Sequence, residues 1–278
     1  MKIAFLQDFF SNEIVGGAEK NDSVLFNYLA DKVNIKQVHT YEIEHQIENY
    51  DFFIVSNFIN LPDGCKEYLI KNQNYIIYEH DHKYVVNRNP GFFKDYKAPE
   101  PAIINKDFYA SAKKVFVLSK ICKEVIELNL GIKNVESIGC SLWSQENLEF
   151  IRATAKNTEK IHKVGVLKSD NKVKGMLPAI EVCKENNIEP YLIYSPDYQD
   201  FIKKLASCEA FLFLPQVLET FSRVCVEAKM LNCSIMTTPK LIGFFSEPYS
   251  SLSGDALNFK IQQQNKIALQ KFEEAIKK

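Results

Sequence analysis

The sequence predicts an α/β protein made of two Rossmann-like domains with a cleft between them. Short apolar runs alternate with helical patterns along the whole chain, and this alternation occurs in two successive stretches. The runs are apolar on consecutive positions, as in strands buried on both faces of a parallel sheet. The length of 278 residues, with 46% hydrophobic and 25% charged side chains, suits two ordinary globular domains.

The first half of the chain contains the longer series of strands. Strands are expected at 2–6, 36–40, 52–56, 74–79, 114–119 and 135–140, and helices near 17–32, 62–72, 101–112 and 120–129. Because consecutive apolar positions require cover on both faces, these helices should pack on the two faces of a parallel sheet.

The second half repeats the pattern over a shorter stretch. Strands are expected at 163–167, 190–194, 210–215 and 233–238, and helices at 175–186, 197–206 and 221–231. The junction should fall near 141–160, where a polar segment follows SLWSQENLEF. We therefore predict an N-terminal domain over 1–155 and a C-terminal domain over 156–278, and leave open that the last helix packs back on the first domain.

The composition excludes several classes of protein. Lys and Arg (34) nearly balance Asp and Glu (35), which argues against binding of nucleic acid through bulk charge. The seven cysteines include no C-x-x-C pair, which favours reduced thiols in the cytoplasm. The N-terminus lacks the features of a signal peptide, and no window approaches the ~20 apolar residues of a membrane span.

Ligands of open α/β sheets bind where the strands end, so the loops at those positions are the candidate sites. Gly16 and Gly17 precede an amphipathic helix, where bare backbone lets an anion reach the helix N-terminus, although a plain turn is the alternative. After the fourth strand comes Glu79-His80-Asp81-His82. His80 is a candidate to bond a substrate hydroxyl or phosphate, to satisfy a strand end, or to bind a metal with His82.

In the second half, charged residues follow the first and third strands. Lys168 and Lys174 lead into a helix start, so cations and helix N-terminus could meet a diphosphate there, although a solvated turn is the alternative. Glu219 precedes a helix, and Glu227 lies eight positions later among apolar residues, where a carboxylate requires a partner. Carboxylates accept hydrogen bonds from sugar and ribose hydroxyls.

The segment E-T-F-S-R-V-C-V-E-A resembles the E-x7-E motif of retaining GT-B glycosyltransferases, especially glycosyltransferase family 4. Other segments resemble the family in the same order: the GGAE loop (16–19), the histidine after the fourth strand (His80-Asp81), the "visible serine" strand (117–119) and the K-G phosphate loop (174–175). Several short matches in order are more specific than any one of them.

The resemblance implies roles for individual residues of the second domain. The first glutamate of the motif contacts the donor sugar and the second binds the ribose, and these roles fall to Glu219 and Glu227. Amides after the first glutamate approach the sugar and the diphosphate, here those of Thr220, Phe221 and Ser222.

The diphosphate clamp of the family is a Lys and an Arg. Lys174 fits the lysine, but Val166 stands in place of the arginine, and Lys168 is the nearest cation by spacing. A lysine does not grip phosphate in the bidentate way of an arginine. Ser222 and Asn232 also stand where the family has glycine.

These observations predict a retaining glycosyltransferase with His80, Glu219 and Lys174 as catalytic residues. Gly16, Gly17, Lys168, Thr220, Phe221, Ser222 and Glu227 would bind the donor, a nucleotide-diphosphate sugar, on the second domain, and the acceptor would bind the first. No D-x-D element occurs, so no metal and no further cofactor is expected. The acceptor is a glycan, a lipid-linked or a small molecule, and peripheral membrane contact is left open.

Three alternatives remain at this stage. One is a non-catalytic protein that binds nucleotide sugars, in keeping with the missing arginine. The second is a sugar-nucleotide epimerase or hydrolase on the same fold. The third is a metallohydrolase built on the Glu79-His80-Asp81-His82 cluster.

Overall fold

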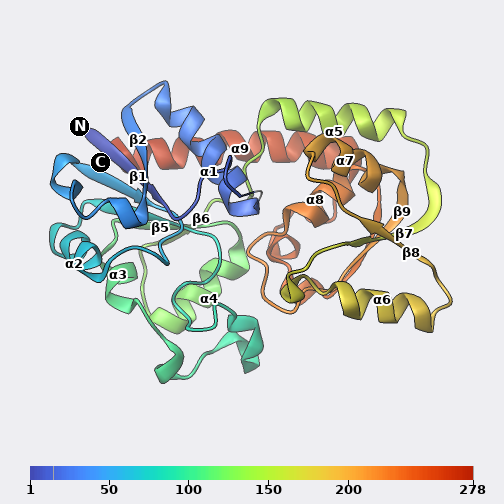
Figure 1. Cartoon of the computed structure of the whole chain (residues 1–278), viewed down its shortest axis with the longest axis horizontal. Helices are drawn as coiled ribbons and strands as arrows, with labels where there is room; N and C mark the ends of the chain where they lie inside the picture. Colours follow the sequence, from blue (N-terminus) through green and yellow to red (C-terminus); the bar gives the residue numbers. More distant parts are fainter. Residues whose placement is uncertain (15, 278) are drawn as a thin grey trace. The chain divides into compact units, whose positions relative to one another are not determined.

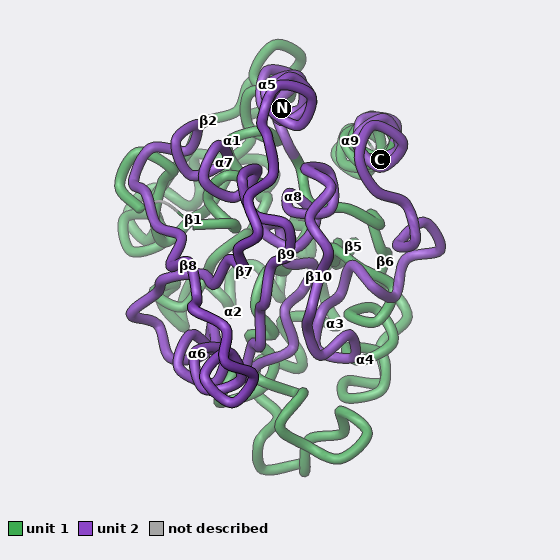
Figure 2. Tube along the Cα trace, turned by 90° about the vertical axis from the view of Figure 1, so that its right-hand side faces the viewer, with its two compact units in different colours: residues 1–142, 264–278 green, residues 143–263 purple. Residues whose placement is uncertain are grey.

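The computed structural model describes residues 1–14 and 16–277, which form two compact units (Figure 1, Figure 2). Unit 1 comprises Met1–Leu142 and Gln264–Lys278, and unit 2 comprises Trp143–Gln263. Helix α5 (Gln145–Asn157) lies in unit 2, where the sequence predicted a polar junction. Ser144 caps this helix by accepting a hydrogen bond from the Asn147 amide, a local signal that the sequence analysis missed.

Unit 1 contains a six-stranded parallel sheet in the order β2-β1-β3-β4-β5-β6. Its strands are β1 (Lys2–Gln7), β2 (Asn34–His39), β3 (Phe52–Val55), β4 (Tyr75–Glu79), β5 (Lys114–Val117) and β6 (Val135–Ser137). Every residue of β3 and β4 is buried, as the consecutive apolar runs require. The strands predicted for the first half are confirmed, and β5 and β6 end earlier than expected.

Helices connect the strands of unit 1. They are α1 (Gly17–Ala30), α2 (Asp63–Asn72), α3 (Lys106–Ser111), α4 (Lys120–Leu130) and the part of α9 (Gly254–Lys277) from Gln264 on, with 3-10 turns at Thr40–Glu42, Ile47–Asn49, Pro90–Phe92, Lys94–Tyr96 and Glu100–Ala102. The helix predicted over 101–112 is shorter because Asn105, just before α3, has a left-handed φ of 56° that interrupts the helical backbone.

The C-terminal part of α9 belongs to the core of unit 1. The ring of Phe272 packs against Tyr78 and Phe116, with centroids 4.8 and 4.3 Å apart. At the surface, Glu273 accepts hydrogen bonds from Tyr28 and Lys32 of the α1 region, at 2.7 and 2.6 Å. The end of the chain therefore covers strands β4 and β5, far from it in sequence.

Unit 2 contains a four-stranded parallel sheet in the order β10-β9-β7-β8. Its elements are β7 (Ile161–Leu167), β8 (Pro190–Ile193), β9 (Cys208–Phe213), β10 (Ser234–Thr237), α5, α6 (Met176–Glu185), α7 (Tyr198–Ser207) and α8 (Arg223–Met230), with 3-10 turns at Lys172–Lys174, Pro239–Leu241 and Gly243–Ser246. The predicted strands and helices of the second half are confirmed. The chain thus has the two Rossmann-like domains of the GT-B fold.

Each sheet has one point where the connections leave in opposite directions. In unit 1, β2 and β3 lie on either side of β1, and in unit 2, β8 and β9 lie on either side of β7. In open α/β sheets, such a switch point leaves a crevice at the carboxyl ends of the strands, where ligands bind. The loops after β1 and β3, and those after β7 and β9, are therefore the places where functional side chains are expected.

Two further findings concern the chain as a whole. Within residues 1–14 and 16–277, no helix combines the length and apolar character required to cross a membrane. All seven cysteines are buried and form no disulfide bond.

Candidate functional site

The loops after β7 and β9 meet at the switch point of unit 2. The Nζ of Lys174, from the first loop, lies 2.7 Å from Oε1 of Glu219, from the second. A backbone hydrogen bond of 2.8 Å from the Gln216 amide to the Val173 carbonyl joins the same two loops. Two of the three predicted catalytic residues are therefore brought into direct contact.

Gly175 allows this close approach. Its φ is 70°, and a Cβ at this position would lie 1.7 Å from the Leu214 carbonyl oxygen in the loop after β9. Any side chain would therefore push the two loops apart. The K-G pair that the sequence singled out holds the lysine at the crevice because only glycine fits behind it.

The loop after β10 also holds the backbone of Glu219 in place. The Glu219 amide donates to the Leu241 carbonyl at 2.9 Å, and its carbonyl accepts from the Gly243 amide at 2.8 Å. These bonds form a parallel bridge between Glu219 and Ile242. The backbone that carries the carboxylate is fixed before any ligand binds, as a precise binding site requires.

Glu227, the second glutamate of the motif, is buried and only 3% exposed. Its Oε1 accepts hydrogen bonds from Trp143 Nε1 at 2.9 Å and from the Tyr198 hydroxyl at 2.8 Å. The Arg223 guanidinium lies 3.6 Å from the same oxygen and 4.3 Å from the centre of the Trp143 ring. The carboxylate thus has the partners that its apolar surroundings demand.

This cluster shifts the titration of its tyrosine. Burial raises the pKa of Tyr198, and the negative charge of Glu227 raises it further. The hydroxyl therefore stays protonated and donates to the carboxylate. Sequence reasoning missed Trp143, Tyr198 and Arg223, although Trp143 is the one tryptophan of the chain and stood in the segment predicted as the junction.

Two other residues of unit 2 that were predicted to bind the donor sugar nucleotide, Lys168 and Phe221, lie in different environments. Lys168 is exposed, and its Nζ lies 5.9 Å from the centre of the Tyr194 ring. Phe221 is buried, with ring contacts to Trp143 and Phe244 at 6.5 and 5.6 Å.

Two residues that stand where the resembled family has glycine adopt the backbone that glycine favours. Ser222 and Asn232 have φ angles of 67° and 60°, both in the left-handed region. Asn tolerates this region better than most residues, whereas serine is strained there. Both positions therefore have a glycine-like backbone without a glycine.

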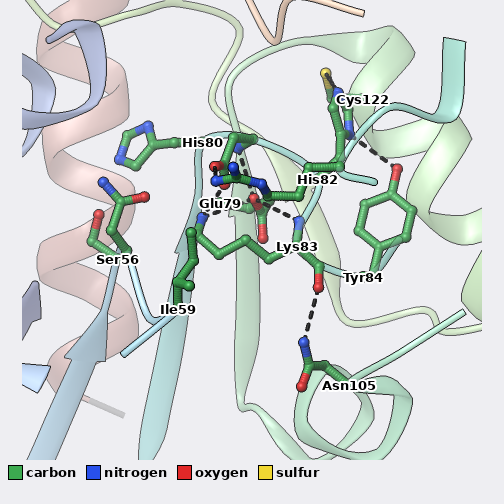
Figure 3. A network of polar contacts seen from close by, with 12 residues as sticks. Ser56, Ile59, Glu79, His80, His82, Lys83, Tyr84, Asn105 and Cys122 are labelled. Atoms are coloured by element: carbon green, nitrogen blue, oxygen red, sulfur yellow. Dashed lines mark hydrogen bonds and ion pairs between the residues drawn. The ribbon is translucent and has the colours of Figure 1, made fainter. Parts of the chain in front are cut away.

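In unit 1, His80 pairs with a buried carboxylate. Its Nε2 lies 2.9 Å from Oδ1 of Asp22, a fully buried residue of α1. Asp22 Oδ2 also accepts from Gln7 Nε2 at 3.0 Å and from Ser56 Oγ at 2.6 Å. Asp22 thus links residues at the carboxyl ends of β1, β3 and β4. The His80 side chain is 3% exposed. Figure 3 shows His80 beside Ser56.

Next to His80 lies a buried ion-pair cluster (Figure 3). The Nζ of Lys83 is 3.2 Å from Oε1 of Glu79 and 2.5 Å from Oδ1 of Asp81, and the Tyr109 hydroxyl donates to Glu79. Burial alone would raise the pKa of Glu79, but the Lys83 ammonium and the hydrogen bonds from the Tyr109 hydroxyl and the Asp81 amide together outweigh burial and hold that pKa below its ordinary value. Burial would lower the pKa of Lys83, and the two carboxylates outweigh it in turn.

The two histidines of the Glu79-His80-Asp81-His82 segment do not meet. His82 Nδ1 lies 3.0 Å from the Tyr84 hydroxyl, and its Nε2 is 4.0 Å from Cys122 Sγ, whereas His80 contacts Asp22. Among the described residues, no group of three or more His, Cys, Asp or Glu side chains is placed to hold a metal. The H-x-H reading of this segment is therefore wrong, because alternate residues after the strand face different partners.

Gly16 and Gly17 lie at the N-terminus of α1 as predicted, but a carboxylate of the protein lies there too. Glu19 folds back so closely that a Cβ on Gly16 would lie 2.0 Å from its Oε2. Asn57 Nδ2 donates to the other carboxylate oxygen at 3.2 Å. Burial raises the pKa of Glu19.

A second carboxylate of unit 1, missed by sequence reasoning, joins three loops. Asp8 follows β1 directly and is 3% exposed. It accepts hydrogen bonds from the Thr40 hydroxyl at 2.5 Å and from the amides of Ile59 and Asn60 at 2.8 and 3.0 Å. The sequence signal that could have identified Asp8 is its position immediately after an apolar run, where a strand ends.

No family model matches the sequence, and no curated protein matches it either. Solved structures with the same fold do exist. HepE of Anabaena in complex with UDP-glucose is 12% identical, with a TM-score of 0.56 over 99% of this chain and 100% of that one. A glycosyltransferase from Rickettsia africae is 11% identical, with a TM-score of 0.58 over 99% and 98%.

An epimerase has the same fold as well. UDP-N-acetylglucosamine 2-epimerase from Rickettsia bellii is 9% identical, with a TM-score of 0.57 over 99% of this chain and 96% of that one. Identities this low establish the fold alone, and the fold extends over nearly the full length of each of the three structures.

Proposed function

We propose that this protein is a glycosyltransferase that moves a sugar from a nucleotide-diphosphate sugar to an acceptor, with the donor on unit 2 and the acceptor on unit 1. The observation that carries the proposal is the Lys174–Glu219 pair at the switch point of unit 2. HepE, which has the same fold, was solved with UDP-glucose, and this supports the choice of donor class.

The two charges of this pair suit the two halves of such a donor. An ammonium at the crevice stabilises the charge that develops on a departing diphosphate, the part that a metal ion plays in other sites. A carboxylate accepts hydrogen bonds from sugar hydroxyls. With the diphosphate at Lys174, Glu219 would exchange its internal partner for hydroxyls of the sugar.

The finer assignment rests on the E-x7-E resemblance. It supports a retaining, metal-independent transfer in which the acceptor attacks on the face of the leaving group, and it supports a ribose contact at Glu227. Because Oε1 of Glu227 already has the Trp143 and Tyr198 donors, a ribose would add to an existing cluster. Nucleotide binding should therefore change the environment of the Trp143 indole.

The hydrogen bond between Trp143 and Glu227 allows a direct test by fluorescence. Trp143 is the single tryptophan, so its fluorescence reports directly on the Glu227 cluster. Titration with nucleoside diphosphates and their sugars should change the emission saturably for at least one base, and a ligand at 100 Kd should stabilise the fold by ~2.7 kcal/mol. Glu227→Gln should weaken that nucleotide about tenfold or more, since hydrogen bonds to a charged group are lost.

Glu209→Gln is the matched control, because Glu209 is an exposed carboxylate of unit 2 that pairs with His162. It should leave the titration unchanged. Absence of a response to every nucleotide tested, in fluorescence and in melting temperature, would contradict the proposal. Turnover is then tested by incubating the bound nucleotide sugar with a panel of acceptors.

The epimerase alternative is supported by the Rickettsia bellii structure. It predicts a changed sugar in the nucleotide-bound product when no acceptor is present. The transferase predicts free nucleoside diphosphate only when an acceptor is supplied, apart from slow hydrolysis. Binding without turnover of either kind would indicate a nucleotide-sugar binding protein.

A further inference from the structure

We propose that unit 1 carries a carbohydrate subsite built on the stacked rings of Phe10, His39 and Tyr41. The inference rests on the proposed function, for which this subsite would be the acceptor site. Its ligand class is a neutral or amino sugar that lays the C–H face of its ring on Tyr41.

The three rings form a nearly parallel stack. The centroids of Phe10 and His39 lie 3.9 Å apart at 21°, and those of His39 and Tyr41 lie 4.9 Å apart at 15°. Tyr41 is nonetheless 55% exposed. Because His39 covers one face of its ring, the exposed area lies on the other face and the edges. The exposed face of an aromatic ring is an apolar surface on which the C–H face of a pyranose ring can pack.

The stack lies at the carboxyl ends of the strands of unit 1, where ligands of open α/β sheets bind. His39 is the last residue of β2 and is paired with Gln7, the last residue of β1. Phe10 is in the loop after β1, and Tyr41 is in the turn that follows β2. All three rings therefore come from carboxyl ends of strands, beside the switch point at β1.

The platform is held in place before a ligand arrives. Glu13 bridges two of its members, with Oε2 accepting from the Phe10 amide at 2.7 Å and Oε1 3.3 Å from His39 Nε2. Asp8 binds the Thr40 hydroxyl, between His39 and Tyr41, and so ties this turn to the loops after β1 and β3. A preorganised surface loses little conformational entropy on binding.

The charges around the stack favour a sugar over an anionic ligand. Glu13 is 40% exposed, and Glu42 and Glu44 are exposed close by in the chain. Carboxylates accept hydrogen bonds from ring hydroxyls. They repel phosphate groups and the negative surface of a membrane, which disfavours a lipid headgroup on these rings.

The test is saturation-transfer NMR on the full chain, without nucleotide. The probes are the methyl α-glycosides of glucose, galactose and mannose and methyl 2-acetamido-2-deoxy-α-glucoside. Ring protons of at least one probe should receive saturation. Tyr41→Ala should weaken that probe about tenfold, as expected for one lost stacking contact, while Tyr41→Phe keeps the face and the signal.

Phe92→Ala is the control, since Phe92 is a 75% exposed aromatic side chain of unit 1 outside the stack. It should bind the probe as the unchanged protein does. Absence of saturation with all four probes, or equal binding by folded Tyr41→Ala, overturns the subsite. So does Tyr41-dependent binding to phosphatidylglycerol vesicles in place of the sugars.

The outcome is separable from the proposed function. The Trp143 titration examines unit 2 with nucleotides, whereas this experiment examines unit 1 with sugars alone. Sugar binding without any nucleotide response would refute the donor proposal and keep the subsite. The reverse pattern would keep the donor proposal and remove the subsite.

Discussion

Lys174 and Glu219, 45 positions apart in the chain, form an ion pair of 2.7 Å that joins the loops after β7 and β9. These strands flank the switch point of unit 2, so the pair lies where a ligand of this sheet would bind. Without a ligand, each charge satisfies the other. A diphosphate would replace Glu219 as the partner of the ammonium.

The two residues should therefore respond differently to substitution. Lys174→Ala should weaken the best-binding nucleoside diphosphate about tenfold or more, since a charge-assisted contact is lost, and should leave the nucleoside unchanged. Glu219→Gln should not weaken the diphosphate, because it removes a competitor for the ammonium, but should lower sugar transfer sharply. Calorimetry and turnover measure the two effects, with exposed Lys172→Ala as the control. Equal losses for nucleoside and diphosphate would show that Lys174 does not contact phosphate.

Gly175→Ala should destabilise the protein much more than Gly131→Ala does. Both glycines have a left-handed φ, 70° and 69°, but a Cβ on Gly131 meets nothing within 4 Å, whereas one on Gly175 meets the Leu214 carbonyl. Strain alone costs about 1–2 kcal/mol, which is the effect expected for Gly131. Urea unfolding followed by circular dichroism measures the difference. Similar losses in the two variants would mean that the loops after β7 and β9 adjust freely.

The buried Lys83–Glu79 pair should make stability depend on acid pH. The pKa of Glu79 is lowered in the folded state, so its ion pair stabilises the fold above the ordinary value of 4.5, and this contribution is lost as the pH falls through the folded pKa. Lys83→Met should cost about 3–5 kcal/mol near neutral pH, because a buried carboxylate loses its cation. The difference from the unchanged protein should shrink as the pH falls from neutral toward 4.5 and below, because without the Lys83 cation burial raises the pKa of Glu79 and the carboxyl of the variant takes up a proton first.

Melting curves between these pH values provide the measurement for Lys83→Met. Lys66→Met, which removes the partner of the 92% exposed Asp63, is the control and should cost little at any pH. A constant difference between Lys83→Met and the unchanged protein across the range would contradict the assignment of the pair as charged.

His80→Ala should lower sugar transfer per folded molecule, while nucleotide affinity, which we assign to unit 2, should stay the same. Asp22→Asn should act on His80 indirectly and should also cost about 1–3 kcal/mol, because a buried acceptor of three hydrogen bonds loses its charge. Turnover and melting temperature on the same samples separate the two effects, and exposed His45→Ala is the control. Normal turnover with a lower melting temperature in His80→Ala would assign His80 to a structural role.

The sequence by itself determined the elements and their order. Runs such as those of β3 and β4, apolar on consecutive positions, can be satisfied only inside a sheet covered on both faces, so local pattern predicted both sheets. It also predicted that Glu227 needs a partner, because a carboxylate within an apolar helix face is costly when unpaired. The order of the short motifs predicted the GT-B fold, and the similarity to the solved structures confirms it.

Only the tertiary structure decided which side chains meet. The partners of Glu227 are Trp143 and Tyr198, 84 and 29 positions away, and no local pattern encodes such pairs. The sequence pattern gave no functional prediction for His39, yet the pairing of β1 with β2 places it between two aromatic rings. Strand register and loop contacts act over long separations, so residue spacing along the chain predicts the elements but not the neighbours across a sheet edge.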